Sequence, residues 1–344
     1  MKELTALLEK LLARVDLEED EAGHLMVALT REDLPPALAA ALLVALRAKG
    51  ETAAEVRGFA RAMRGLARKP AVPDDLPTLD IVGTGGDGSG SLNISTGASL
   101  LAAACGIPVV KHGNRSVSSR SGSADVLEAL GMRLPADAAQ AGACLADTGY
   151  TFLFAPHFHP AMKAVAPVRK AMGVRTVFNL LGPLTNPAAP PYLLLGAFSP
   201  AAARLMAEAL AGFEGLERAF VVHGSPGWDE ATPVGPFVLY EVRGAQVSET
   251  TRDPAEWGLA RCTADDLAGG DASVNAARLR AALEGQDAGP HLDALLLGTA
   301  LALELTGRAD SPATAIAMAR AAVEDGRARA QLEALASNNR EGAA

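Results

Sequence analysis

LDIVGTGGDGSGSLNIST, residues 79–96, is the stretch of sequence that decides the fold class of this chain. Residues 79–82 predict a short strand that ends in a glycine turn. Five glycines follow almost at once, and glycine lets backbone N–H groups approach a ligand without a Cβ in the way. Asn93, Ser95 and Thr96 then precede an alanine- and leucine-rich helix, whose start favours an anion. This order of strand, glycine loop and hydroxyl-rich helix start predicts a phosphate-binding loop.

The glycine loop does not match the common nucleotide-binding patterns. It lacks the Lys followed by Ser or Thr that ends a Walker loop, and GTGGDG only approaches GxGxxG. Asp87 is unusual there, because a carboxylate repels phosphate unless it holds a cation or accepts hydrogen bonds from a sugar. For this loop alone, a tight strand-to-helix turn without a ligand is an open alternative.

The composition of the chain limits the classes of function. Its 344 residues are enough for two domains, and a hydrophobic share of 49% predicts a sizeable core. A net charge of −9 argues against a nucleic-acid surface as the main function. Three distant cysteines in apolar surroundings indicate reduced core thiols. Because no signal peptide or membrane span is visible, we expect a cytoplasmic protein with no membrane partner.

The helical and strand patterns divide the chain in two. Residues 1–69 predict a small all-helical domain of four helices, with Asp16, Asp33 and Thr52 as N-caps of the later three. Its apolar stripes either pack on each other or cover a subunit contact. Residues 70–77 form a proline-rich linker, and residues 78–344 predict an α/β domain.

The α/β domain is expected to hold a central, largely parallel sheet flanked by helices, with ligands at the carboxyl ends of the strands. A middle segment near residues 170–190 can pack with the helical domain. From about Ala264 the pattern is helical again. Besides the strand at 79–82, strands are predicted at residues 107–110, 150–154, 192–196, 219–222 and 237–242.

A second stretch with binding character is KHGNRSVSSRSGSAD, residues 111–125. It follows the strand at 107–110, so it is expected at the same sheet edge as the glycine loop. Cationic, serine and glycine residues together suit phosphate or pyrophosphate. A solvated charged loop is the alternative, and two such loops at neighbouring strand ends make it less attractive.

Two later stretches add a candidate carboxylate site and a candidate metal site. In HFHPAMKAVAPVR, residues 157–169, Arg169 suits bidentate recognition of a carboxylate, while the two histidines favour pocket lining over metal binding. In VVHGSPGWDEATPVGP, residues 221–236, Asp229 and Glu230 are adjacent and suit Mg²⁺. An ordinary acidic turn is the alternative, but beside two anion loops the metal site is favoured.

At these residues the sequence resembles the anthranilate phosphoribosyltransferase family, which has a nucleoside phosphorylase-like fold and acts in tryptophan biosynthesis. The resemblance covers nearly the whole chain, with Ser91 where a threonine is more usual. It implies a homodimer formed through the helical domains and ligands bound between the two domains. The motifs that carry it are GTGGDG, NIST, KHGNR, SGSAD, HPAMK, FNLLGPLTNP, VVHG with its DE pair, and GGDA.

The resemblance also implies the reaction and the site. The amine of anthranilate attacks C1 of phosphoribosyl pyrophosphate (PRPP), giving N-(5-phosphoribosyl)anthranilate and pyrophosphate, with Mg²⁺. Gly83, Asn114 and Arg169 would contact anthranilate, and Ser95, Asp229 and Glu230 would hold magnesium. The residues that would contact PRPP are Gly83, Gly86, Asp87, Ser91, Asn93, Ile94, Ser95, Thr96, Lys111, His112, Gly113, Asn114, Arg115, Ser116, Val117, Ser118, Ser119 and Ser123.

The chemistry of this reaction agrees with the residues present. Pyrophosphate leaves as an anion, so it needs cations and N–H donors already in place. The aryl amine is neutral at pH 7 and needs no strong base, so catalysis would rest on positioning and charge stabilisation. We expect Arg169 to orient the anthranilate carboxylate and Lys111 to stabilise the departing pyrophosphate.

Two other functions compete with this one. A pyrimidine nucleoside phosphorylase would share the architecture but would need neither the acidic pair nor Arg169. A noncatalytic nucleic-acid-binding relative would need a basic surface, which the net charge of −9 disfavours.

Overall fold

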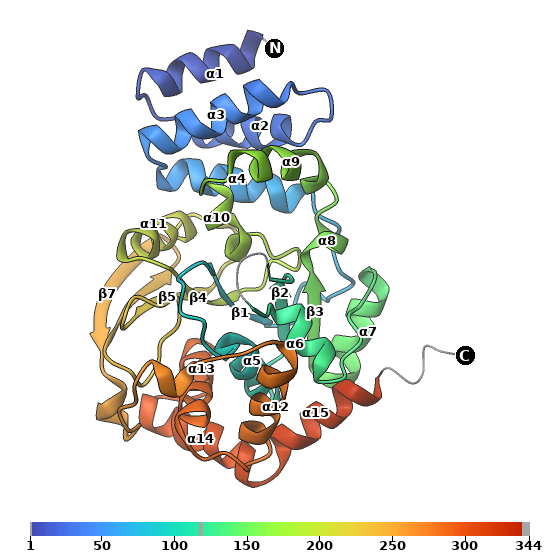
Figure 1. Cartoon of the computed structure of the whole chain (residues 1–344), viewed down its shortest axis with the longest axis vertical. Helices are drawn as coiled ribbons and strands as arrows, with labels where there is room; N and C mark the ends of the chain where they lie inside the picture. The colour runs from blue at the N-terminus through green and yellow to red at the C-terminus, as the bar shows by residue number, and fades with distance from the viewer. Residues whose placement is uncertain (1, 117–119, 339–344) are drawn as a thin grey trace.

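The computed structural model describes residues 2–116 and 120–338, which form a helical part above a larger α/β part (Figure 1). The predicted fold class is confirmed. Within these residues the helical part begins with a bundle of α1 Lys2–Leu12, α2 Glu19–Leu29, α3 Pro36–Lys49 and α4 Ala53–Gly65.

The predicted helix caps have mixed outcomes. Thr52 caps α4 as predicted, because its hydroxyl accepts a hydrogen bond from the backbone N–H of Glu55 at 3.3 Å. The predictions for Asp16 and Asp33 are wrong. Asp16 pairs with Lys49 Nζ at 2.6 Å, and Asp33 pairs with the arginine two residues before it. The helices begin further along the chain: α2 follows Glu18, whose N–H donates to the Glu21 carboxylate at 2.8 Å, and α3 starts at a proline, which suits the first helical position.

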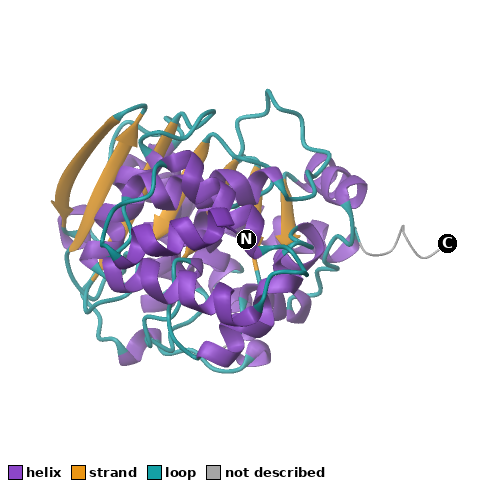
Figure 2. Ribbon diagram, turned by 90° about the horizontal axis from the view of Figure 1, so that it is seen from above, coloured by secondary structure: helices purple, strands orange, loops and turns teal. Residues whose placement is uncertain are grey.

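In the described part of the chain, seven strands form one sheet in the order β3-β2-β1-β4-β5-β6-β7. The strands from β3 to β5 are parallel, and β6 and β7 are antiparallel. Figure 2 shows strands and helices interleaved in this part, with the outermost strands at one side of the molecule. The strands are β1 Leu79–Gly83, β2 Val109–Gly113, β3 Tyr150–Phe154, β4 Tyr192–Gly196, β5 Arg218–Gly224, β6 Phe237–Arg243 and β7 Gln246–Arg252.

Two strand predictions need correction. The predicted strand at 107–110 lies at Val109–Gly113, so Lys111 and His112 belong to β2 and not to the following loop. β7 was not predicted, because its sequence QVSETTR is polar and its residues are almost all exposed. An edge strand of this kind has no apolar alternation to detect.

The order of the strands places the binding crevice. The chain passes outward from β1 through β2 to β3 and then returns to the other side of β1 as β4. Parallel sheets bind ligands at such a switch point, outside the carboxyl ends of the strands. The glycine loop follows β1 and leads into α5 Ile94–Ala104, so it lies at this point.

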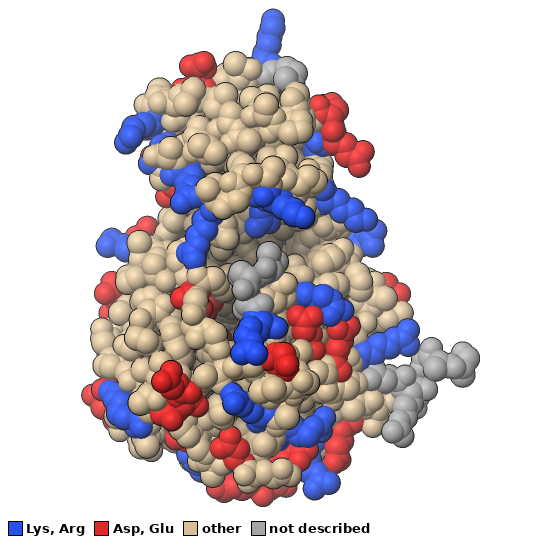
Figure 3. Space-filling model, in the orientation of Figure 1, with Lys and Arg blue, Asp and Glu red and all other residues tan. Residues whose placement is uncertain are grey.

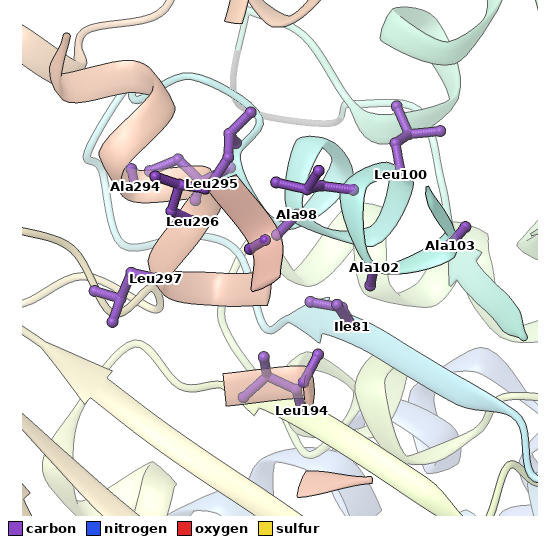
Figure 4. Close-up of a cluster of buried hydrophobic side chains, with 14 of the residues drawn as sticks. Ile81, Ala98, Leu100, Ala102, Ala103, Leu194, Ala294, Leu295, Leu296 and Leu297 are labelled. Carbon is purple, nitrogen blue, oxygen red and sulfur yellow. The ribbon is translucent and has the colours of Figure 1, made fainter. Parts of the chain in front are cut away.

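The two faces of the sheet are covered by different layers. On one face, α5 and α13 cover β1 and β4, and Figure 4 shows side chains from all four elements meeting there, including Ile81, Ala98, Leu194 and Leu295. The helices of this layer are α5, α6 Ser123–Ala129, α12 Ala272–Leu283, α13 Pro290–Leu305, α14 Pro312–Glu324 and α15 Arg327–Ser337.

The opposite face shares its core with the helical bundle. Residues of α9, α10 and α11 pack in one apolar cluster with the bundle and with β4, β5 and β6. The remaining elements of the described chain include α7 Ala138–Thr148, α8 Ala155–Phe158, α9 Met162–Met172, α10 Phe178–Leu181, α11 Pro200–Leu210, η1 Gly182–Leu184, η2 Pro254–Trp257 and η3 Asp265–Leu267. None of the helices described has both the length and the hydropathy that a membrane crossing requires.

Candidate active site

The backbone around the acidic pair crosses the ends of three strands. A Cβ on Gly83 would lie 2.4 Å from Asp229 Oδ2, and one on Gly196 would lie 1.5 Å from the carbonyl oxygen of Asp229. A Cβ on Gly224 would lie 1.9 Å from the carbonyl oxygen of Glu230. Only glycine fits at these strand ends, and their absent side chains let the acidic pair lie directly against β1, β4 and β5.

Both carboxylates of the pair are tied to the glycine loop and to the start of α5. Asp229 Oδ2 accepts a hydrogen bond from the N–H of Gly85 at 2.5 Å and lies 3.4 Å from the hydroxyl of Thr84. Glu230 Oε1 accepts one from the N–H of Ser95 at 3.1 Å. The structure therefore brings together Ser95, Asp229 and Glu230, the three residues expected to hold magnesium.

The negative charges of Asp229 and Glu230 are only partly balanced by nearby positive charge. Burial, with a further contribution from the carboxylate of Asp87, raises the pKa of Asp229 to about 7. Burial and the neighbouring Asp229 raise the pKa of Glu230 to about 8, and Lys111 only partly opposes this. Carboxylates with raised pKa values favour a cation that can neutralise them.

Asp87 joins the glycine loop to the acidic pair. Its Oδ1 accepts hydrogen bonds from the N–H and the hydroxyl of Ser89, both at 3.0 Å, and its Oδ2 accepts one from the N–H of Asp229 at 3.2 Å. Across residues 2–116 and 120–338, no three His, Cys, Asp or Glu side chains are grouped as a metal site. The acidic pair with a serine would thus leave most ligand positions to water and substrate oxygens, as Mg²⁺ prefers.

The glycine loop presents unused backbone donors. Gly85, Gly86 and Gly88 have φ values of 66°, 73° and 74°, which side chains with a Cβ rarely adopt. In the described part of the chain, the N–H groups of Gly86, Asp87 and Gly88 have no hydrogen-bond acceptor. Successive N–H groups of this kind form an anion-binding concavity.

The start of α5 is held by a residue that sequence analysis missed. Asn275 in α12 donates from Nδ2 to Asn93 Oδ1 at 2.8 Å and accepts a hydrogen bond from the N–H of Gly270 at 2.6 Å. An asparagine three residues beyond the GGDA motif was the available signal. Ile94 lies in the core, and its N–H donates to the carbonyl of Leu92, so neither group faces the loop.

Other predicted residues at this helix start keep polar groups available. Thr96 is buried, and its hydroxyl has no partner within the described residues. The hydroxyl of Ser91 lies 3.1 Å from that of Ser89. Ser89 and Ser91 lie on the chain between the unused N–H groups and α5, and Thr96 lies in the first turn of α5.

Lys111 lies in a different place from the one its expected role required. Its side chain is buried beneath the loop, and Nζ donates to the carbonyl of Ile81. Burial lowers its pKa, while Asp80, Glu230 and Asp229 act in the opposite direction. Its charge is therefore directed at the buried carboxylates and not at the open surface of a loop.

His112 is buried beside Lys111 and is neutral. Burial and the nearby His159 lower its pKa to about 3, and the two ring centroids are 5.0 Å apart. Burial also lowers the pKa of His159 to about 4. The Nε2 atom of each ring is buried, with no hydrogen-bond partner in the described chain.

In the basic loop after β2, the charge of Arg115 is neutralised by nearby acidic side chains. Arg115 Nη1 lies 2.7 Å from carboxylate oxygens of both Asp125 and Glu128 on α6. The hydroxyl of Ser123 donates to the carbonyl of Asn114 at 3.3 Å, and the N–H of Ser116 donates to Asp125 at 3.3 Å. Only glycine fits at position 113 without a shift of its neighbours, since a Cβ there would lie 2.4 Å from Ser123 Oγ. The predicted contacts Val117, Ser118 and Ser119 lie outside the described residues.

Arg169 lies in the last turn of α9, in the helical part above the sheet. Its guanidinium is stacked 4.9 Å from the ring centroid of Phe178. Among the described residues it has no hydrogen bond or ion pair, and burial lowers its pKa. Figure 3 shows a hollow between the two parts of the molecule with Lys and Arg side chains along its upper rim.

Asp80 and Asn186 form a buried link that sequence analysis did not identify. Asn186 Nδ2 donates to Asp80 Oδ2 at 2.8 Å and to the carbonyl of Val110 at 2.7 Å. Burial raises the pKa of Asp80 to about 6, despite the nearby charge of Lys111. The signal was a carboxylate inside the otherwise apolar strand LDIVG.

The fold and the site together define a class of two-domain transferases. Residues 5–67 match the family model described as the glycosyl transferase family, helical bundle domain. Residues 75–329 match the model described as the glycosyl transferase family, a/b domain.

Comparison with individual proteins narrows the class, and the chain belongs to the anthranilate phosphoribosyltransferase family. It is 47% identical to the enzyme of that name from Desulforudis audaxviator over 328 residues, 95% of this chain and 94% of the relative. The crystal structure of the Thermus thermophilus enzyme matches with a TM-score of 0.90 at 45% identity, covering 97% and 99% of the two chains. The Saccharomyces cerevisiae enzyme in complex with PRPP and Mg matches with a TM-score of 0.88 at 28% identity, covering 97% of each.

Proposed function

We propose that this protein is an anthranilate phosphoribosyltransferase, which transfers the phosphoribosyl group from PRPP to the amine of anthranilate and releases pyrophosphate. The observation that carries this proposal is the meeting of a glycine loop with unused N–H donors and an acidic pair at the switch point of the sheet. Arg169, on α9 in the helical part, adds an arginine without an ion pair in the described chain. The complex of the yeast relative with PRPP and Mg supports the same pair of ligands.

The glycine loop is the proposed site of the pyrophosphate group. The free N–H groups of Gly86, Asp87 and Gly88 supply donors that need no rearrangement when charge develops on the leaving group. Asn93 and Thr96 at the start of α5 would add polar contacts, and Asn275 keeps Asn93 in position. Gly113, Asn114 and Ser116 would contact the phosphoribosyl group from the second loop.

Mg²⁺ is the proposed cofactor, held by Ser95, Asp229 and Glu230. These oxygen donors fit a hard divalent cation. Burial and repulsion from neighbouring carboxylates raise the pKa of both side chains, although Lys111 opposes the rise at Glu230, and a bound cation would relieve that repulsion. When bound, the ion would offset the charge of the pyrophosphate. Lys111, buried beneath the pair, would moderate the repulsion between the two carboxylates.

Arg169 is the proposed partner of the anthranilate carboxylate. Its guanidinium is half-buried and free of other anions in the described chain, so it is available for a bidentate contact. Because the substrate amine is neutral at pH 7, orienting it toward C1 of PRPP is sufficient and no general base is assigned.

Anthranilate fluorescence followed with PRPP and Mg²⁺ tests this function in the wild type and in Arg169→Ala. We expect rapid Mg²⁺-dependent loss of fluorescence in the wild type. We expect the KM for anthranilate to rise about 10- to 100-fold in the variant, as for loss of a charged hydrogen-bonding partner. Lys170→Ala, which removes an exposed cation one residue along α9, is the matched control. A folded wild type that leaves intact PRPP and anthranilate unreacted would refute the assignment.

We also propose a homodimer formed through the helical part, divided from the α/β domain near residues 70–77. Large apolar side chains are exposed on this part, among them Leu12 at 62%, Val15 at 48% and Val44 at 48%. Light scattering of the wild type and of Leu12→Asp tests this contact, with a shift toward monomer expected. A monomeric wild type at micromolar concentration would contradict it.

The proposed location is the cytoplasm, with small-molecule substrates and a second copy of the chain as partners. The chain's net charge of −9 supports the absence of a nucleic-acid partner. Retention on heparin that persists at high salt would contradict that view.

A further inference from the structure

Arg175 makes a contact between the helical part and the glycine loop. It lies between α9 and α10, and its Nη2 donates a hydrogen bond to the carbonyl of Gly86. The same guanidinium is stacked 4.5 Å from the ring centroid of Phe198, just after β4. A planar cation that stacks and donates at once has its orientation fixed in two directions.

Both ends of this contact are held in place. Arg47 of α3 donates to the carbonyl of Arg175 at 2.6 Å, which anchors the arginine to the bundle. On the other side, the N–H of Phe198 donates to the hydroxyl of Thr84 at 3.0 Å, and the N–H of Thr84 donates to the carbonyl of Gly196 at 2.9 Å. The Arg175 contact therefore connects the bundle with the strand ends that carry the loop.

The direction of the Gly86 carbonyl determines the direction of the next N–H group. A trans peptide is planar, so its C=O and N–H point to opposite sides. When Arg175 holds the carbonyl of Gly86, the N–H of Asp87 points away from Arg175. That N–H has no acceptor within the described chain. Gly86 carries no Cβ, so on this side of the peptide no side chain of its own restricts the orientation of the carbonyl, and the contact with Arg175 can fix it.

We propose that Arg175 is a positioning residue for the phosphoribosyl donor. By holding the peptide between Gly86 and Asp87, it keeps the loop N–H groups directed at the pyrophosphate group. It also links the donor loop to α9, whose last turn carries Arg169. This inference rests on the proposed function and assigns Arg175 no direct contact with either substrate.

A purely structural role for Arg175 predicts different behaviour, and the molecule offers a control for it. Arg57 of α4 donates to the carbonyl of Ala209 at 2.9 Å and so joins the same two parts far from the loop. Loss of Arg57 should therefore lower the melting temperature without a selective effect on PRPP. Arg175→Ala should weaken PRPP binding selectively and leave the melting temperature close to that of the wild type.

The experiment compares wild type, Arg175→Ala and Arg57→Ala by steady-state kinetics and by calorimetry with pyrophosphate and Mg²⁺. We expect Arg175→Ala to raise the KM for PRPP and the Kd for pyrophosphate about tenfold or more, with a KM for anthranilate within twofold of wild type. Millimolar methylguanidinium should restore much of this loss, because it can occupy the vacated place beside Phe198.

Unchanged pyrophosphate affinity in Arg175→Ala, or equal rises in both KM values with a lower melting temperature, would overturn the proposal. Failure of the proposed function shows separately, as a wild type without turnover. The calorimetry needs no turnover, so it tests Arg175 in either case.

Discussion

The loops after β1 and β2 have similar anion-binding composition in the sequence but differ in the structure. In the loop after β1, the N–H groups of Gly86, Asp87 and Gly88 have no acceptor among the described residues, and the carboxylate of Asp87 accepts hydrogen bonds from Ser89 and from the N–H of Asp229. In the loop after β2, Arg115 is paired with the two acids of α6. The comparison indicates that the formal charge of a loop does not tell how many of its hydrogen-bond donors are available to an anion.

The same contrast applies beneath the loops. Under the glycine loop, Lys111 and Asp229 are buried and Glu230 is half-buried, so one cation lies near two carboxylates. Behind the basic loop, His112 and His159 are neutral. The charged chemistry is therefore concentrated on the side of β1 that faces β4 and β5.

The largest effect is expected for Asp229→Asn, which removes charge from the glycine-loop side. We expect kcat/KM to fall by roughly 10³, about 4 kcal/mol, because one carboxylate of the proposed cation site is lost. Steady-state kinetics with a Mg²⁺ titration measures it, and Asp74→Asn in an exposed turn is the control. A fall in kcat/KM of less than fivefold would show that the Asp229 carboxylate is not needed for activity, and the acidic pair would then not set the glycine loop apart from the basic loop.

The second prediction concerns the neutral histidines behind the basic loop. His112 has a folded pKa of about 3, against about 6.5 unfolded. The unfolded chain therefore binds more protons below pH 6.5, and stability falls as the pH falls. In urea unfolding, the free energy of unfolding of the wild type should fall by roughly 2 kcal/mol more than that of His112→Gln between pH 6.5 and 4.5. Parallel pH profiles for the two proteins would mean that folding does not lower the pKa of His112.

The third prediction tests how closely the acidic pair must lie against β1. In Gly83→Ala, the new Cβ would displace the Asp229 carboxylate, whose Oδ2 lies 2.4 Å from the Cβ position. We expect kcat/KM to fall roughly 10²-fold, as for a displacement of about 1 Å at a site of this kind. Gly65→Ala at the end of α4 meets no atom within 4 Å and is the control. Equal activity of the two variants would disprove the close fit.

The smallest effect is expected on the basic-loop side, for Arg115→Ala. Its ion pairs are largely exposed, so the unfolding free energy should fall by less than about 1 kcal/mol. The KM for PRPP should change by less than about threefold, since the guanidinium is already paired. A rise of tenfold or more in the KM for PRPP would mean that Arg115 breaks its ion pairs with Asp125 and Glu128 to bind PRPP. Both loops would then bind the donor, and the contrast between them would disappear.

Much of the fold was predictable because its strands are buried on both faces. Residues 150–154 and 192–196 are apolar runs of the right length, and they match β3 and β4. β7 could not be predicted, because an exposed edge strand needs no apolar pattern. β2 was placed too early, because Lys111 and His112 read as loop residues until their burial beside Asp80 is known.

The site divides in the same way. The acidic pair and the glycines were predictable, because local chemistry and spacing define them. Arg175 and Asn275 act through contacts with residues far away in the sequence, Gly86 and Asn93, so no local pattern marks them. The pairing of Arg115 with Asp125 lies within one stretch, but composition alone does not show which charges neutralise each other.

The shared core of the bundle and α11 has a consequence for biosynthesis. Arg57 reaches a carbonyl 152 residues later, and Arg64 reaches one 120 residues later. The apolar faces that pack on α9, α10 and α11 are thus translated long before their partners. On the ribosome the bundle emerges before α11, and the apolar side chains on this side stay exposed until α11 has left the exit tunnel.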